Sequence, residues 1–357
     1  MGDNVLIEYQ PIYNNKILYQ MFSEFNLLDK IKNANYIVIK PNFAAGTYVE
    51  LDSHVVTDVK MIGKLIEFLL TIDPNKTIYI AEADSTGFGF AFLKFENLQL
   101  PGSLEISEEA LKHVRLLDMS RDILKHIENS HFKYFTNFDK QLWLSKTLME
   151  CDFIIDATNL KTHSVTGFTG ACKNLFGTLY QCDKWVFHTH ISEVIHDLTI
   201  AINPTLSIVD GFYGMEYNGP VAGKKINAGF RIWSTNPIAA DIVSCKMIAY
   251  SPYKVKYLKE LIKTTGLNPN SVLENTDIRK NKIRPFHPPF IFLRVMNKVG
   301  LRIQRIGEVL QYFGHRIHVT NSFFQLLIAI ARPLLMAIFG KERLVKIKHK
   351  LYGKKNN

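Results

Sequence analysis

The sequence predicts an α/β protein with a largely parallel sheet and helices on both of its faces. Short apolar, β-branched runs alternate with segments of helical periodicity between residues 36 and 250, the pattern of successive βαβ units. Polar stretches that contain glycine or proline follow the apolar runs. A basic, apolar-rich segment closes the chain and predicts an additional amphipathic helical arm.

Each element is justified by its local pattern. The predicted strands are the apolar runs 36–40, 77–81, 153–155, 206–209 and 231–234. Apolar residues recur at helical spacing in 55–70, and helices are also predicted at 171–180, 193–202 and 238–250. The last helix follows Asn236-Pro237, and proline is favourable at a first helical position because its missing N–H costs nothing there.

Charge divides the chain into two parts. Residues 279–357 hold 17 Lys and Arg against two Glu, whereas residues 1–278 carry a net charge of −5. The sequence therefore predicts an α/β body at 1–278 and a basic arm at 279–357, an asymmetry that speaks about partners more than about fold.

The cysteines and the N-terminus indicate the compartment. None of the four cysteines forms a C-x-x-C pair, so we expect free thiols and no iron–sulfur cluster held by this chain's own cysteines. The first residues lack a basic start and a long apolar stretch, so no secretory leader is expected. Both features predict a cytoplasmic protein.

Polar clusters follow four predicted strands. They are Lys40-Pro41-Asn42, Glu82 with Asp84, residues 156–173, and Asp210-Gly211. Ligands of parallel α/β sheets bind at the carboxyl ends of the strands. We therefore expect these clusters to converge on one crevice, although Lys40 to Asn42 could equally be a turn that ends a strand.

The stretch from Asp156 to Gly177 concentrates this chemistry. Lys161, His163 and Lys173 stand among threonines and glycines, including Thr166 and Thr169. We interpret it as a strand, a polar loop and a helix start that offers backbone N–H groups to an anion. Two cations and an imidazole could clamp a phosphate or carboxylate, or hold a substrate near a general base. The alternative is a polar loop whose threonines cap the next helix.

The clusters, in this order, resemble the family called domain of unknown function 362 over roughly residues 34–267. The matching pieces are Ile39-Lys-Pro-Asn42, Ala83-Asp84-Ser85, Lys161-Thr162-His163, Thr166–Gly170, Lys173-Asn174-Leu-Phe-Gly177, His188, Asp210-Gly211, Met215-Glu216, Gly219-Pro220 with Gly223, and Asn236–Asp241. Some members carry a ferredoxin-like cysteine cluster, which implies redox partners, but this chain has none.

The predicted site combines the matched residues with the strand-end residues. Substrate-binding candidates are Lys40, Asn42, Asp84, Lys161, Thr162, Thr166, Thr169, Lys173, Asn174, Glu216 and Gly219. The catalytic candidates are His163, Asp210 and His188. For Asp241, inside a predicted helix, we favour a structural role.

The histidines raise the question of a metal. His188 and His190 form a His-x-His pair that would point to one side of a strand, and His196 follows. With a carboxylate such as Asp210, His188 could hold a divalent metal. The alternative is that one histidine makes a hydrogen bond within the site and the others lie at the surface. The identity of any cofactor stays open.

The C-terminal arm interleaves apolar residues with cations. Residues 322–340 are almost wholly apolar, but Arg332-Pro333 interrupts them, and an arginine in mid-membrane costs about 2.5 kcal/mol or more. We therefore favour an arm that lies on an anionic membrane surface over one that spans the bilayer. Packing on the body, or contact between copies, is the alternative, and nucleic acid is disfavoured because much aliphatic surface separates the cations.

Three functions follow from this sequence. The first is an enzyme that acts on an anionic, possibly lipid-linked substrate while docked peripherally on the membrane. The second is a non-catalytic redox-accessory or scaffold protein that binds a cofactor or a protein partner in the same crevice. The third is a nucleic-acid binder.

Overall fold

The computed structural model describes residues 4–10, 14–43, 54–84, 95–96, 98–137, 140–181, 184–221, 223–291 and 294–302. The chain divides into two compact units, residues 1–297 and 298–357. The first unit thus extends beyond residue 278, where the sequence analysis ends the body. The following paragraphs describe the first unit.

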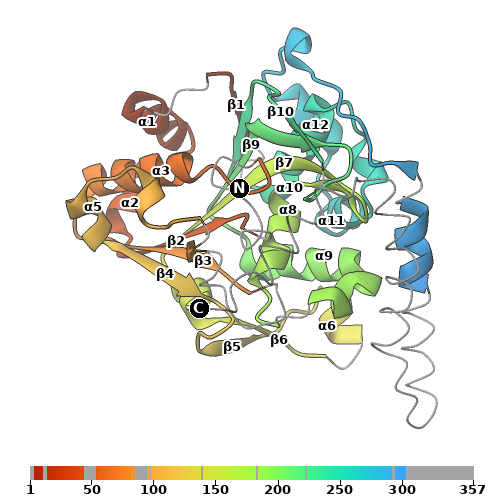
Figure 1. Ribbon diagram of the computed structural model, residues 1–357, viewed down its shortest axis with the longest axis horizontal. Coiled ribbons are helices and arrows are strands. Elements are labelled where there is room, and N and C mark those ends of the chain that lie inside the picture. Colours follow the sequence, from red (N-terminus) through yellow and green to blue (C-terminus); the bar gives the residue numbers. More distant parts are fainter. Residues whose placement is uncertain are drawn as a thin grey trace, which may run out of the picture. The chain divides into compact units, whose positions relative to one another are not determined.

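A mixed sheet organises this unit (Figure 1). Nine strands of the described residues form it, in the order β1-β11-β9-β7-β2-β3-β4, with β10 beside β9 and β8 beside β7. The strands are β1 (Val5–Glu8), β2 (Tyr36–Pro41), β3 (Thr77–Glu82), β4 (Val114–Asp118), β7 (Phe153–His163), β8 (Gly167–Thr169), β9 (Leu206–Glu216), β10 (Lys224–Ile226) and β11 (Arg231–Ser234). A separate antiparallel pair comprises β5 (Leu124–Ile127) and β6 (Leu142–Ser145).

The centre of the sheet is parallel and its edge is not. Strands β9, β7, β2, β3 and β4 run parallel to their neighbours, whereas β11 is antiparallel to β9 and β1 is antiparallel to β11. All five predicted strands are present, and the prediction of a largely parallel α/β sheet is confirmed. Every residue of β7 is buried, as expected for a central strand covered on both faces.

Helices cover both faces of the sheet, as predicted. They are α1 (Asn15–Glu24), α2 (Leu28–Asn33), α3 (Val59–Ile72), α5 (Glu108–Lys112), α6 (Tyr134–Asn137), α7 (Lys146–Glu150), α8 (Ala171–Asn174), α9 (Ile191–Ile202), α10 (Pro237–Met247), α11 (Lys256–Thr265) and α12 (Pro269–Glu274). Local caps explain the main starts. The Asp58 side chain accepts a hydrogen bond from Lys60 N at α3, and Asn236 accepts from Ile238 N and Ala239 N at α10.

Two apolar cores lie on opposite faces of the sheet. Ile37, Ile39 and Ile155 pack in one core with α1, α2 and α3, whereas Val38 and Ile154 belong to the other core with α8 to α11. Alternate residues of one strand therefore serve different cores, as the period of two requires. Figure 1 shows α1, α2 and α3 on one side of the sheet and α8 to α11 on the other.

The structure corrects the predicted local structure of the central stretch. The third strand does not end at residue 155, because β7 continues to His163 and turns back as β8. The predicted helix 171–180 is a four-residue α8 followed by a 3-10 turn, Leu175–Thr178. His188 and His190 lie in the 3-10 helix Lys184–His190, so the expected strand is wrong there.

Most of the predicted arm lies outside the described residues, which end at Arg302, and this includes the apolar run 322–340. Residues 294–302 are helical. No helix among the described residues is long and apolar enough to cross a bilayer. Cys151, Cys172 and Cys245 are free thiols, whereas Cys182 is outside the described residues.

Candidate functional site

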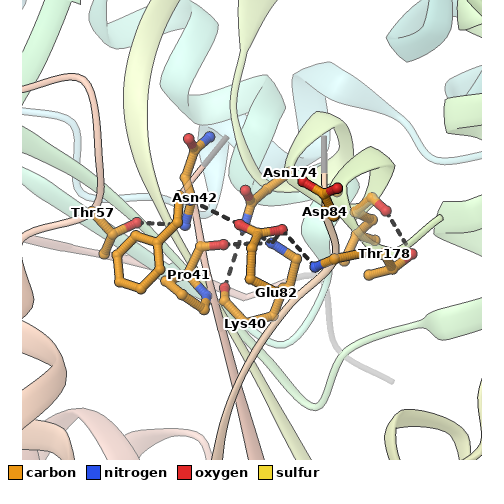
Figure 2. A network of polar contacts seen from close by, with 12 residues as sticks. Lys40, Pro41, Asn42, Thr57, Glu82, Asp84, Asn174 and Thr178 are labelled. Carbon is orange, nitrogen blue, oxygen red and sulfur yellow. Dashed lines mark hydrogen bonds and ion pairs between the residues drawn. The ribbon is translucent and has the colours of Figure 1, made fainter. Parts of the chain in front are cut away.

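The polar ends of β2, β3 and β7 meet at the carboxyl edge of the sheet, as expected from their parallel direction. Nζ of Lys161, on β7, lies 3.2 Å from Oδ1 of Asn42, just beyond β2, and also donates to the carbonyl of Val55. Lys40 pairs with Glu82 of β3, 3.2 Å away (Figure 2). Segments more than 100 residues apart thus form one polar cluster.

Glu82 is the acceptor at the centre of this cluster. Its carboxylate receives hydrogen bonds from Phe43 N at 2.9 Å and from Ala83 N at 3.0 Å, in addition to the Lys40 ammonium (Figure 2). Lys40 and Glu82 are both buried. The predicted ligand Lys40 is therefore neutralised inside the protein, and sequence reasoning missed Glu82 because it stands outside the matched family pattern.

Asn174 joins α8 to the two central strands. Its Nδ2 donates to Asp156 Oδ1 at 2.7 Å and to the carbonyl of Lys40 at 3.2 Å. Burial raises the pKa of Asp156 to about 8, although Asn174 and Lys40 oppose the shift. At neutral pH the Asp156 carboxyl is therefore largely protonated, and its Oδ2 has no hydrogen-bond partner among the described residues.

Two lysines near this edge lack an acidic partner. Lys161 is buried, and burial together with the nearby Lys173 ammonium lowers its pKa to about 7 against the opposing effect of Glu82. Lys173 is partly buried, and desolvation lowers its pKa to about 8. Its Nζ lies 5.8 Å from the centroid of the Phe176 ring. Neither lysine forms an ion pair with a described residue.

His163 has a defined tautomer. Its Nδ1 accepts hydrogen bonds from Val165 N at 3.0 Å and Thr166 N at 3.3 Å, so the ring proton is on Nε2. Burial, followed by the nearby Lys173, His188 and Lys161, lowers its pKa well below the ordinary value. His163 is therefore a neutral donor through Nε2–H, rather than a cation or a base that uses Nδ1.

Two further polar groups of the β7–β8 hairpin are buried without a partner among the described residues. Thr169 lies directly opposite Lys161, and its hydroxyl is unpaired. Asn159 donates from Nδ2 to the carbonyl of His54 at 2.7 Å, while its Oδ1 is unpaired. The patterns that located the lysines gave no reason to select Asn159.

The start of α8 does not offer N–H groups to a ligand, contrary to the sequence prediction. Ala171 N and Cys172 N both donate to the Asp241 carboxylate, at 2.6 and 3.2 Å. Burial raises the pKa of Asp241 to about 7, opposed by these same hydrogen bonds. The structural role favoured for Asp241 agrees with these contacts. Neither threonine caps nor an anion occupies the helix start.

Other predicted residues shape the backbone around the hairpin. The hydroxyl of Thr162 donates to the carbonyl of Tyr217 at 2.7 Å, and that of Thr166 donates to the carbonyl of Phe168 at 2.9 Å. A Cβ on Gly219 would lie 1.9 Å from the carbonyl oxygen of Thr162. Gly219 thus permits a close approach of two backbones, and these groups position the hairpin.

Asp210 lies in a different contact group from His163. Its carboxylate is 3.6 Å from Nε of Arg231, which also pairs with Glu8 at 2.7 Å, and it accepts from Phe212 N. Burial raises the pKa of Asp210 against the opposing effect of Arg231. These buried contacts join β1, β9 and β11.

The histidines do not assemble a metal site within the described parts of the chain. No group of three or more His, Cys, Asp or Glu side chains there could hold a metal ion. Nδ1 of His188 lies 3.0 Å from the carbonyl of Lys184. His196 instead bridges Asp197 and Thr264, at 2.8 and 2.9 Å. The described contacts of His188 and Asp210 thus involve different partners.

Two remaining candidates bind other segments. Glu216 accepts from the backbone and ring of His287, at 3.0 and 2.7 Å. Burial raises the pKa of Glu216, but these hydrogen bonds outweigh it and leave the pKa below its usual value. The carbonyl of Asp84 accepts from Lys184 Nζ at 2.7 Å, so Lys184 belongs to the edge cluster although sequence reasoning did not select it.

The chemistry available at this edge is that of a donor-rich, weakly hydrated site. Lys161, Lys173, the Nε2–H of His163 and the hydroxyl of Thr169 are donors without a carboxylate partner among the described residues. Such a set suits negatively charged oxygen atoms.

A curated protein shares part of this sequence. The thylakoid-associated protein of Synechocystis sp. is 30% identical over 148 residues, which cover 39% of this chain. The match spans 46% of that protein, somewhat under half of its length.

A solved structure shares part of the fold. The lactate racemase apoprotein from Thermoanaerobacterium thermosaccharolyticum superposes with a TM-score of 0.42 at 14% identity, over 66% of this chain and 54% of that one.

The family resemblance noted in the sequence is confirmed at the level of the whole domain. The sequence profile of the family described as Domain of unknown function (DUF362) matches residues 37–246. These residues include β2, β3, β7, β8, α8 and β9, and thus every strand end that contributes to the edge cluster. The chain therefore belongs to the DUF362 family.

Proposed function

We propose that the carboxyl-edge site binds the anionic group, phosphate or carboxylate, of a small-molecule or lipid-linked substrate, and that the protein is an enzyme acting on that substrate. One observation carries the proposal. Lys161 and Lys173 are held near each other with reduced pKa values and with no carboxylate partner among the described residues. An anion would supply the missing counter-charge.

The individual roles follow from the contacts. Lys161 and Lys173 would neutralise the anion, and the Thr169 hydroxyl would donate to one of its oxygen atoms. His163, being neutral, would donate from Nε2 to an oxygen on which charge develops during the reaction. We assign no proton transfer to Asp210, since its carboxylate is already engaged by Arg231.

Isothermal titration of the full chain with phosphate, sulfate and acetate tests binding directly. Lys161→Met should weaken the tightest anion about tenfold or more, since a charge-assisted hydrogen bond contributes about 1.5–3 kcal/mol. Lys76→Met is the matched control, because Lys76 is equally buried but donates to the carbonyl of Ala34 before β3. Unchanged affinity in both Lys161→Met and His163→Ala would overturn the proposal.

Analysis of what co-purifies separates an enzyme from a binding protein. A substrate or product that exchanges during titration favours an enzyme. A permanently bound cofactor, or a stable protein partner with the site unoccupied, favours the non-catalytic accessory function.

Peripheral docking on a membrane is the second part of the proposal. Phe290, Ile291, Val295, Met296 and Val299 are exposed apolar side chains within ten residues, interleaved with cations, and the strongly basic sequence follows them. Apolar side chains beside cations suit an anionic lipid surface. The name of the thylakoid-associated relative is in keeping with this location.

Co-sedimentation with lipid vesicles tests the docking. Full-length protein should bind vesicles that contain anionic phosphatidylglycerol more tightly than vesicles of phosphatidylcholine alone, and salt should weaken the binding. Equal failure on both vesicle types, with salt-sensitive binding to DNA or RNA instead, would favour the nucleic-acid function.

A further inference from the structure

The donors of the edge site come from one small hairpin and the helix that follows it. Lys161 and Thr169 are directly opposed in the antiparallel β7–β8 pair, so their side chains leave the same face of the hairpin. His163 is two residues after Lys161 on the same strand and shares that face. Lys173 stands four residues beyond β8, on α8. Charged and neutral donors thus approach one volume from two elements.

The charges around this volume do not balance. The charged groups that influence Lys161 and His163 are Lys173, His188 and Glu82. Glu82 is the acid of that set, and it already serves Lys40 and two backbone N–H groups. Asp156, the other nearby acid, is hydrogen-bonded to Asn174. Two ammonium groups therefore remain without a full counter-charge.

We propose that the group bound between Lys161 and Lys173 is a tetrahedral dianion, the phosphate of a phosphomonoester, and that the protein takes up protons when it binds. This rests on the proposed anion site. A dianion balances two ammonium groups, whereas one carboxylate balances one. Its several oxygen atoms also provide acceptors for His163 Nε2–H and the Thr169 hydroxyl, both of which lack described partners.

Proton uptake follows from the state of the empty site. Burial leaves Lys161 with a pKa of about 7 and Lys173 with a pKa of about 8, so at pH 8 the pair is only partly charged. A dianion between them favours the charged form of both lysines and raises both pKa values. Binding at pH 8 should therefore consume about one proton or slightly more.

Sulfate is the probe that isolates the protein's own protons, because it carries two charges throughout this pH range. Titrations of the full chain at pH 8, in two buffers of different ionisation enthalpy, give the number of protons taken up. The sulfate affinity should fall about tenfold or more between pH 7 and pH 9. Acetate should bind at least about tenfold more weakly than sulfate at pH 7.

Lys161→Arg provides the discriminating variant, because arginine stays charged at every pH used. It should keep sulfate binding but take up less proton and lose part of the pH dependence. If its unfolding curve shows that it does not fold, Lys173→Arg serves the same purpose at a partly buried position.

The outcomes separate the two proposals. Acetate that binds as tightly as sulfate overturns the dianion, while the anion site stands. Sulfate binding without proton uptake overturns the coupling. Absence of binding by phosphate, sulfate and acetate alike overturns the proposed function and this inference with it.

Discussion

A Cβ atom on Gly170 would lie 2.1 Å from Oδ1 of Asp241. The same carboxylate accepts the hydrogen bonds of Ala171 N and Cys172 N, so the absent side chain lets the carboxylate reach the start of α8. The glycine between β8 and α8 is thus required by an internal contact, which the sequence alone suggested was an opening for a ligand.

Replacing Gly170 with alanine should therefore destabilise the protein. The carboxylate must move and leave two buried N–H groups unsatisfied, at a cost of about 1–3 kcal/mol for each. Urea unfolding followed by circular dichroism measures the effect. Gly102→Ala is the control, because a Cβ there meets nothing within 4 Å, and it should change the free energy of unfolding little. Equal stability of the two variants would contradict this account of Gly170.

Asp156→Asn should change how stability depends on pH. Burial raises the pKa of Asp156 to about 8 from a model value of 3.8, so the native state binds more protons than the unfolded state between these limits. The contribution of this carboxyl is full below about pH 4 and is lost as the pH rises towards 8. Asparagine keeps the Oδ1 acceptor for Asn174 but has no charge to bury.

Urea midpoints of wild type and Asp156→Asn at pH 5 and pH 8 test this sign. The wild type should lose stability relative to the variant as the pH rises. A wild type that gains on the variant over the same interval would show that the carboxylate is stabilised in the native state.

Removing one partner of the buried Lys40–Glu82 pair should be costly. Glu82→Leu leaves the Lys40 ammonium uncompensated and strips an acceptor from Phe43 N and Ala83 N, with an expected loss of about 3–5 kcal/mol. The double variant with Lys40→Met should lose less than the sum of the single losses. Glu109→Leu, which breaks the exposed pair with Lys112, should cost under about 1 kcal/mol. Additive losses at Lys40 and Glu82 would contradict direct coupling.

Membrane docking predicts a position-specific effect of apolar side chains. Ile291→Ser, at a side chain that is 79% exposed, should weaken binding to anionic vesicles several-fold while leaving thermal unfolding unchanged. Ile123→Ser is the matched control, since Ile123 is 70% exposed but lies far from the basic arm in the sequence. Identical vesicle binding by the two variants would argue against a docking role for residues 290–299.

The architecture was predictable because it rests on local patterns. Runs such as Ile37 to Ile39 and Phe153 to Ile155 alternate between two cores, and each was recognisable as a strand from its apolar residues alone. The extension of β7 to His163 was not predictable in this way. Its polar residues are buried by contacts with distant segments, such as that of Lys161 with Asn42, and polar residues in a run usually indicate a loop.

The site was predictable as a place more than as a set of roles. Strand-end positions and the matched motif located Lys161, His163 and Lys173, which do lie near one another. The neutral state of His163 depends on two backbone N–H groups of the following turn, which only coordinates reveal. The engagement of Lys40 by Glu82 likewise depends on the pairing of β2 with β3.

The contact between Lys161 and Asn42 also has a consequence for how the protein folds. These residues are 119 positions apart, and Asn174 reaches back 134 positions to Lys40. Closing such long loops is slow, because chain entropy is lost before the contact is gained. The site is therefore completed only when β2, β3 and β7 have paired. A ligand of this edge can recognise only the finished fold, and it should protect the protein from unfolding in proportion to the logarithm of its concentration.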